Sequence, residues 1–233
     1  MEIHGFAKTT LLDYPTHVAA TVFTGSCNFR CPFCHNGDLV MTPGQVPIVP
    51  EDEVLAYLKK RQGILEGVCI TGGEPTLQPD LESFIRKIRD LGYLVKLDTN
   101  GYRPEILSSL LEKGFLDYVA MDIKNSKDKY ALTVGKANFD LQKIETSVSL
   151  LMNGSIPYEF RTTIVKELHT PADLRQIGEW ITGAKGYFLQ DYRDSEKVIS
   201  PGFTGYSKED LFAMRDLLRT YIPNTQVRGV DNI

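Results

Sequence analysis

Three closely spaced cysteines are the residues of this chain whose types and spacing most clearly predict chemistry. Cys27, Cys31 and Cys34 are separated by three and then two residues. Iron–sulfur clusters are held by cysteine thiolates, and a cluster of four irons normally takes four of them. Three thiolates would leave one iron free to bind a substrate, much as a catalytic zinc site keeps one position open. The spacing therefore favours a chemically active cluster over a simple electron store.

Two other interpretations of the cysteines stay open at this point. The four cysteines of a secreted chain could form two disulfides, although 233 residues can build a core without them. A structural zinc ion would need a fourth ligand, and His35 follows Cys34, but adjacent residues rarely both reach one tetrahedral ion. We expect the remaining cysteine, Cys69, to lie in the core, because it stands in a short apolar run and free cysteine is often buried.

Composition narrows the class of protein. A hydrophobic content of 42% and a charged content of 24% are typical of an ordinary globular protein. The net charge of -4 gives no basic footprint for nucleic acid. The N-terminus lacks a signal-peptide pattern, and no apolar stretch is long enough to span a bilayer. We therefore expect a cytoplasmic protein that binds neither nucleic acid nor membrane.

Short apolar runs alternate with amphipathic segments along the chain. The expected strands are 18–24, 67–71, 93–98, 118–123, 158–165 and 186–190, and a terminal strand is expected around Arg228. One expected helix begins near Pro50, and five more cover 79–91, 104–113, 141–153, 171–181 and 208–221. This alternation indicates βαβ units and a parallel sheet. Six units are too few for a closed eight-stranded barrel, which leaves a partial barrel or a doubly wound sheet. No linker divides the chain, so we expect one domain over residues 1–233.

Polar residues gather where the predicted strands end. They are the cysteine loop, Thr71-Gly-Gly-Glu-Pro75, Asp98-Thr-Asn-Gly101, Asp122 with Lys124, Arg161 with Thr163, and Gln190. Ligands of α/β proteins bind at the carboxyl ends of parallel strands. Each element has an ordinary alternative as well, because two glycines can form a plain turn and Asp122 and Lys124 can form a structural ion pair. Six strands contributing polar groups at one end nevertheless predict a site.

Together, the cysteine triad, Gly-Gly-Glu-Pro, Asp-Thr-Asn-Gly and the Asp-Ile-Lys strand resemble a radical S-adenosylmethionine enzyme. The chain is most similar to the glycyl-radical-enzyme activases, in particular the anaerobic ribonucleoside-triphosphate reductase activating proteins. Thr10-Leu-Leu-Asp-Tyr-Pro15 and Cys34-His-Asn36 belong to the resemblance, which covers nearly the whole chain. It implies an α/β fold, a six-stranded partial TIM-like (β/α)6 barrel with parallel strands.

The resemblance also implies a role for each matching position. Cys27, Cys31 and Cys34 would hold a [4Fe-4S] cluster, whose open iron takes the amino and carboxylate groups of the methionine moiety. The cofactor would further be contacted by Phe33 near the adenine, Gly72, Gly73 and Glu74 at the amino group, Asp98, Thr99 and Asp122 around a monovalent cation, and Lys124 and Arg161 nearby. Some activases place a histidine on the sixth strand against the adenine; here Gln190 is the nearest candidate.

The implied reaction is reductive cleavage of S-adenosylmethionine to methionine and a 5′-deoxyadenosyl radical. In an activase this radical abstracts hydrogen from one glycine of a partner glycyl-radical enzyme. A one-electron donor such as flavodoxin or ferredoxin would reduce the cluster. A radical enzyme acting on a small molecule, similar to 7-carboxy-7-deazaguanine synthase, is the nearest alternative. An iron–sulfur electron carrier is the alternative outside enzymes, but a carrier needs no ring of polar groups on six strands.

Overall fold

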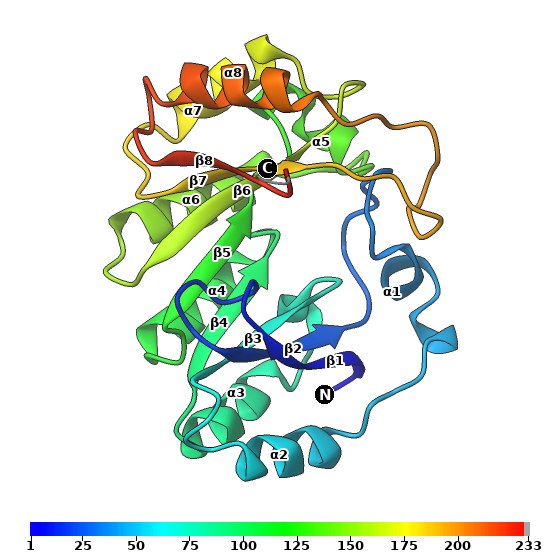
Figure 1. Ribbon diagram of the computed structural model, residues 1–233, viewed down its shortest axis with the longest axis vertical. Coiled ribbons are helices and arrows are strands. Elements are labelled where there is room, and N and C mark those ends of the chain that lie inside the picture. Colours follow the sequence, from blue (N-terminus) through cyan, green and yellow to red (C-terminus); the bar gives the residue numbers. More distant parts are fainter. Residues whose placement is uncertain (231–233) are drawn as a thin grey trace.

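A single eight-stranded sheet forms the centre of the computed structural model, which describes residues 1–230. The strands are β1 (Ile3–Thr10), β2 (Ala19–Thr24), β3 (Gly67–Gly72), β4 (Leu94–Thr99), β5 (Tyr118–Asp122), β6 (Tyr158–Ile164), β7 (Tyr187–Asp191) and β8 (Thr225–Arg228). Their order in the sheet is their order in the chain. The strands β2 to β8 pair in parallel, and β1 pairs antiparallel with β2. The curved sheet does not close, so the expected α/β partial barrel is confirmed (Figure 1).

Six helices follow the strands in βαβ fashion and flank the sheet (Figure 1). They are α2 (Glu51–Lys60), α3 (Leu81–Asp90), α4 (Pro104–Glu112), α6 (Leu141–Asn153), α7 (Pro171–Trp180) and α8 (Lys208–Leu218). Local sequence explains their bounds. The α3 helix buries Leu81, Phe84, Ile85 and Ile88, which recur at helical spacing on one side. The α7 helix begins with a capping box between Thr170 and Asp173. All six helices expected from the sequence are present.

Shorter elements fill the connections at one end of the sheet. They are α1 (Gly37–Met41), α5 (Tyr130–Thr133) and the 3-10 turns η1 (Pro43–Gln45), η2 (Pro75–Leu77) and η3 (Lys127–Lys129). The α1 and η1 elements occupy part of the long stretch that follows the cysteines. The 191–206 stretch forms a loop, and its Lys197 accepts a hydrogen bond from the backbone N–H of Gly37.

The two outer strands differ from the expectation of six. The six expected strands are the central six of the sheet, β2 to β7. The terminal strand near Arg228 exists as β8, but β1 was not predicted. Only Ile3 of β1 is buried and the rest of the strand is half-buried or exposed, so the segment has neither a clean period of two nor a continuous apolar run. Its antiparallel pairing with β2 forms it instead.

Charged and polar side chains line part of the sheet's inner face, whereas the outer face packs on the helices. In β4, Val95 and Leu97 join the apolar core, while the alternate residues Lys96 and Asp98 form an ion pair with each other. Asp98 also pairs with Arg161 of the more distant β6, so these side chains meet inside the curve of the sheet. The fold therefore directs its alternating polar residues toward one interior space.

Candidate functional site

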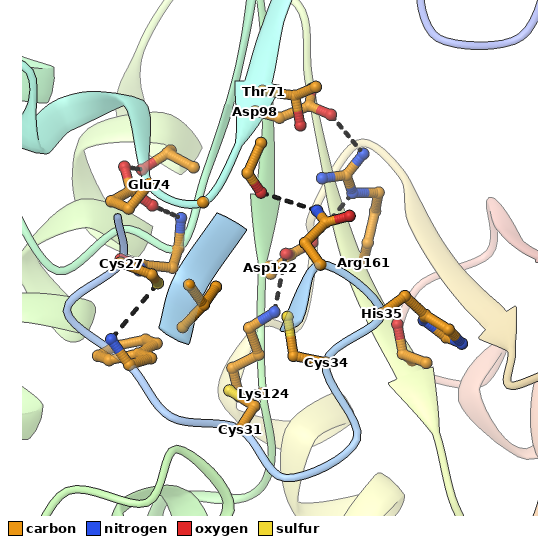
Figure 2. A pocket seen from close by; sticks show the side chains of 18 of the residues that line it. Cys27, Cys31, Cys34, His35, Thr71, Glu74, Asp98, Asp122, Lys124 and Arg161 are labelled. Atoms are coloured by element: carbon orange, nitrogen blue, oxygen red, sulfur yellow. Dashed lines mark hydrogen bonds and ion pairs between the residues drawn. The ribbon is translucent and has the colours of Figure 1, made fainter. Parts of the chain in front are cut away.

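A pocket with a volume of about 240 Å³ opens at the carboxyl ends of the parallel strands (Figure 2). The three loop cysteines and all ten other residues expected at the site line it: Cys27, Cys31, Cys34, Phe33, Gly72, Gly73, Glu74, Asp98, Thr99, Asp122, Lys124, Arg161 and Gln190. Phe29, His35, Asn36, Val40, Thr71, Asn100 and Thr163 complete its wall. The structure thus brings together residues that are spread over more than 160 positions of the chain.

The cysteine loop follows β2 and is held by backbone hydrogen bonds on both sides. The N–H of Arg30 donates to the carbonyl of Val134, and the N–H of Ser200 donates to that of Pro32. Burial raises the pKa of the Cys27 thiol to about 11 and that of Cys31 to about 12. These two groups are therefore protonated thiols in the absence of a metal, and metal binding would release their protons.

The disulfide and zinc interpretations of the cysteines are not supported by this geometry. All four cysteines are free, and Cys69 is fully buried on β3 as expected. His35 directs its Nε2 toward the carbonyl of Arg193, so it does not supply the fourth zinc ligand.

Five alternating charges cross the pocket floor from β4 to the end of β5. Arg161 donates from Nη1 to Asp98 Oδ2 and from Nε to Asp122 Oδ1, both at 3.0 Å. Lys124 Nζ lies 2.9 Å from Asp122 Oδ2, and Lys96 pairs with the other oxygen of Asp98. Lys124 and Arg161 line the pocket beside the two carboxylates, whereas Lys96 does not reach its surface, and the two lining cations can meet an anionic group of a ligand.

The electrostatics of this row keep both carboxylates ionised. Burial alone would raise the pKa of Asp122, but Lys124 and Arg161 lower it to about 2. Burial opposes ionisation of Asp98 as well, and Arg161 and Lys96 bring its pKa below the usual range. The carboxylates in turn raise the pKa of Lys124 and of Arg161 despite their burial. Asp98, Asp122, Lys124 and Arg161 are therefore all charged at neutral pH.

The two glycines after β3 allow the backbone segments around the pocket to approach one another. Gly72 has a φ of 118°, which favours glycine, and a Cβ there would collide with the backbone of Thr24. A Cβ on Gly73 would collide with the carbonyl of Ser26, next to Cys27. The side-chain amide of Asn36 donates to the carbonyl of Gly72 at 2.8 Å. The glycine pair thus serves close packing between the β3 turn and the cysteine loop.

Glu74 lies in the pocket wall, but its carboxylate is already occupied by donors from the protein. Its Oε1 accepts from the hydroxyls of Thr76 and Thr99, at 2.6 and 2.8 Å, and its Oε2 accepts from the backbone N–H of Asn100 at 2.7 Å. The side chain is fully buried, and burial raises its pKa. Glu74 and Thr99 therefore tie the β3 turn to the end of β4, which the sequence did not reveal.

The two remaining expected residues, Phe33 and Gln190, also line the pocket. Phe33 is buried and meets the rings of His169 and Phe203 edge-on, at centroid distances of 5.9 and 6.0 Å. Gln190 faces Thr163, with 3.5 Å between the two side-chain oxygens. Asn100 was not singled out as a site residue, although it stands in the Asp-Thr-Asn-Gly run that the sequence had already marked.

Comparison with known families identifies the class of protein that this fold and site define. The family described as "Radical SAM superfamily" matches residues 21–169, which include the three loop cysteines and the strands β3 to β6. The chain belongs to the radical S-adenosylmethionine superfamily. Members of this family are enzymes that use a [4Fe-4S] cluster together with S-adenosylmethionine.

Individual relatives carry the comparison further. A protein of Methanocaldococcus jannaschii, provisionally named a glycyl-radical enzyme activating enzyme, is 27% identical over 98% of this chain and 96% of its own length. A protein of Saccharolobus solfataricus, named a probable GTP 3′,8-cyclase, is 31% identical over 60% of this chain but only 46% of its own length. Among solved structures, a domain of a pyruvate-formate lyase-activating enzyme from Bacteroides vulgatus has a TM-score of 0.58. It is 17% identical and covers 70% of this chain and 99% of that domain, so it shows the fold alone.

The residues present fit the two groups that the family implies. Three thiols from one loop line the pocket, and Lys124, which is paired with Asp122, lies near Cys31 and Cys34. Beside Cys27, the buried Nδ2 of Asn28 has no hydrogen-bond partner, which indicates that an acceptor from outside the chain belongs there.

None of the described helices is long and apolar enough to cross a membrane.

Proposed function

We propose that this protein is a glycyl-radical-enzyme activase whose partner is an anaerobic ribonucleoside-triphosphate reductase. The observation that carries the proposal is the likeness to the M. jannaschii relative over nearly the full length of both chains. The match to the GTP cyclase relatives leaves more than half of their length uncovered, so it carries less weight for function. The preference for the reductase over other glycyl-radical enzymes follows from the sequence resemblance of the motifs.

In this proposal the loop thiolates of Cys27, Cys31 and Cys34 hold the [4Fe-4S] cluster. When bound, the cluster and S-adenosylmethionine supply the electron and the organic radical that abstracts hydrogen from the partner's glycine. A flavodoxin or ferredoxin would provide the electron. The chain's own contribution is to bind the cofactor, to orient it and to keep water from the reacting atoms.

Specific residues that line the pocket would bind and orient the cofactor. Lys124 and Arg161 would attract the carboxylate of the methionine moiety. The backbone at Gly72 and Gly73, which lines the pocket, would face its amino group, whereas Glu74 supports that turn from behind. Phe33 and Gln190 lie where an adenine could pack. The open sheet leaves lateral room for a protein loop, which suits a glycine within a folded partner.

In this chain, cationic side chains already pair with the carboxylates that would bind the monovalent cation implied by the resemblance. Asp98 and Asp122 would be its ligands, yet their oxygens already accept from Lys96, Arg161 and Lys124. We therefore propose that the chain supplies this positive charge itself, chiefly through Lys96. No oxygen of either carboxylate is left without a cationic side chain beside it.

The decisive experiment is anaerobic. The protein is reconstituted with iron and sulfide and mixed with S-adenosylmethionine, a reductant and a candidate anaerobic ribonucleotide reductase, and the electron paramagnetic resonance spectrum is recorded. A glycyl-radical doublet on the reductase together with 5′-deoxyadenosine is expected. Cleavage of the cofactor without the doublet would contradict the partner and favour a small-molecule substrate. An intact, reduced cluster that cleaves nothing would turn the interpretation to electron transfer.

A further inference from the structure

We infer that the side-chain amides of Asn28 and Asn100 form a relay in which Asn100 donates to Cys27 and Asn28 donates to a sulfur of the cluster, and that these hydrogen bonds raise the reduction potential of the cluster. This inference rests on the proposed function, because it takes Cys27 as a cluster ligand. It gives Asn28 and Asn100 a role in tuning the cluster and positioning its cysteine ligand, because they contact Cys27 and not the substrate.

The geometry around Cys27 carries the first step. Asn100 Nδ2 lies 3.7 Å from the Sγ of Cys27 and 2.7 Å from the Oδ1 of Asn28. The backbone N–H of Phe29 also points at this sulfur, at 3.4 Å. Two N–H groups thus approach one sulfur, and Asn100 is only 5% exposed, so water does not compete with its amide.

The direction of both amides is fixed by their neighbours. The backbone N–H of Tyr102 donates to Asn100 Oδ1 at 3.0 Å, so the amide nitrogen of Asn100 must face Cys27 and Asn28. That nitrogen donates to Asn28 Oδ1, which places the Asn28 nitrogen on the other side. Glu74 also holds the backbone of Asn100, accepting its N–H at 2.7 Å. Neither amide can be reversed without setting two donors or two acceptors against each other.

The last link of the relay points to an absent acceptor. Asn28 Nδ2 is buried and finds no hydrogen-bond partner in the described part of the chain. A buried amide N–H without an acceptor is rare in proteins. The acceptor that belongs beside a cysteine ligand is a sulfur of the cluster, because cluster sulfides and thiolates accept N–H hydrogen bonds. The orphaned donor is therefore independent support for the relay.

The expected effect follows from charge. A hydrogen bond from an N–H group stabilises an electron-rich sulfur, and the reduced cluster carries one electron more than the oxidised one. The donors stabilise the reduced state more than the oxidised state, which raises the potential.

The test is a redox titration of the reconstituted, full-length protein, with the reduced cluster followed by electron paramagnetic resonance. We expect Asn100→Ala to make the reduction equilibrium roughly tenfold less favourable, which is about 59 mV for one electron. Asn28→Ala should shift it in the same direction. The matched control is Asn125→Ala, because Asn125 is a buried amide that bonds to Thr133 and the carbonyl of Leu168 and makes no contact with a cysteine.

Equal potentials for the wild type, Asn100→Ala and Asn28→Ala would overturn the inference, as would an equal shift in Asn125→Ala. If Asn100→Ala fails to retain iron, Asn28→Ala decides, because Asn28 holds no backbone segment in place. The titration requires neither S-adenosylmethionine nor a partner enzyme. A failed activase assay would therefore leave this result intact, whereas a wild type that binds no cluster would sink the proposed function itself.

Discussion

Lys96 and Asp98 lie two residues apart on the inner face of β4 and form an ion pair inside the barrel. Only 2% of the Lys96 side chain and 13% of the Asp98 side chain are exposed. A buried lysine is rare unless it is paired. Lys96 is therefore the buried last member of the row of charges. Asp98 is held between this ammonium and the guanidinium of Arg161.

Replacing Lys96 with methionine tests whether its ammonium takes the place of a monovalent cation. Lys96→Met leaves the buried Asp98 with one cation instead of two, and we expect the free energy of unfolding to fall by about 3 kcal/mol. Potassium should restore part of this loss. Chemical denaturation in potassium chloride and in tetramethylammonium chloride at equal ionic strength measures both effects. The control is Lys60→Met, on the exposed side of α2. A wild type that itself gains stability specifically from potassium would contradict the proposal.

The low pKa of Asp122 predicts an acid-sensitive fold. Its pKa is about 2 in the folded protein, below the value of 3.8 for the free group. A lowered folded pKa contributes stability above the unfolded pKa, and this stability is lost as the pH falls from about 4 to about 2. The contribution is about 2 kcal/mol. Urea denaturation as a function of pH should show this slope, and Asp122→Asn should flatten it. An unchanged slope in the variant would assign the acid sensitivity to other groups.

Gly73→Ala should disturb the contact between the β3 turn and the cysteine loop. The added methyl group would overlap the carbonyl of Ser26, which accepts the backbone N–H of Glu74 at 2.8 Å. We expect a loss of stability of about 1–3 kcal/mol, as for other cases of overpacking, and weaker binding of S-adenosylmethionine. Thermal unfolding and equilibrium dialysis measure the two effects. Gly44→Ala is the control, because a Cβ there meets no atom within 4 Å; equal behaviour of the two variants would refute this role.

The sequence predicted the place of the site better than its internal bonding. Parallel strands end at a common edge, so Asp98, Asp122 and Arg161 could be expected to meet once their strands had been recognised. Lys96 could not be assigned in the same way, because a lysine within an apolar strand gives no sign of which partner neutralises it. The partners of Glu74 and Asn100 come from loops on different strands. Such contacts depend on how the loops pack, which local periodicity does not encode.

The fold likewise contains elements that local sequence predicts and elements that depend on tertiary contacts. The central strands each contain a short apolar stretch or alternate apolar with polar residues, and the helices have clear apolar sides and end signals, so these elements follow from local sequence. The β1 strand is stabilised by its antiparallel pairing with β2 rather than by its own pattern. The buried position of Cys69 was predictable from its apolar neighbours, but its contacts with Asp98 and Lys96 at 3.6 Å were not.

Cysteine substitutions separate the proposed ligands from the core cysteine. Cys31→Ala should abolish cluster binding and cleavage of S-adenosylmethionine, because two thiolates would remain where three are needed. Cys69→Ala should retain both, since Cys69 lies on β3 outside the pocket wall, and it should lower stability by about 1–2 kcal/mol through the cavity it leaves. Iron content, the visible absorption spectrum and 5′-deoxyadenosine formation distinguish the two variants after identical anaerobic reconstitution. Retained cleavage in Cys31→Ala would exclude the three-cysteine cluster, and loss of iron in Cys69→Ala would place the fourth thiol among its ligands.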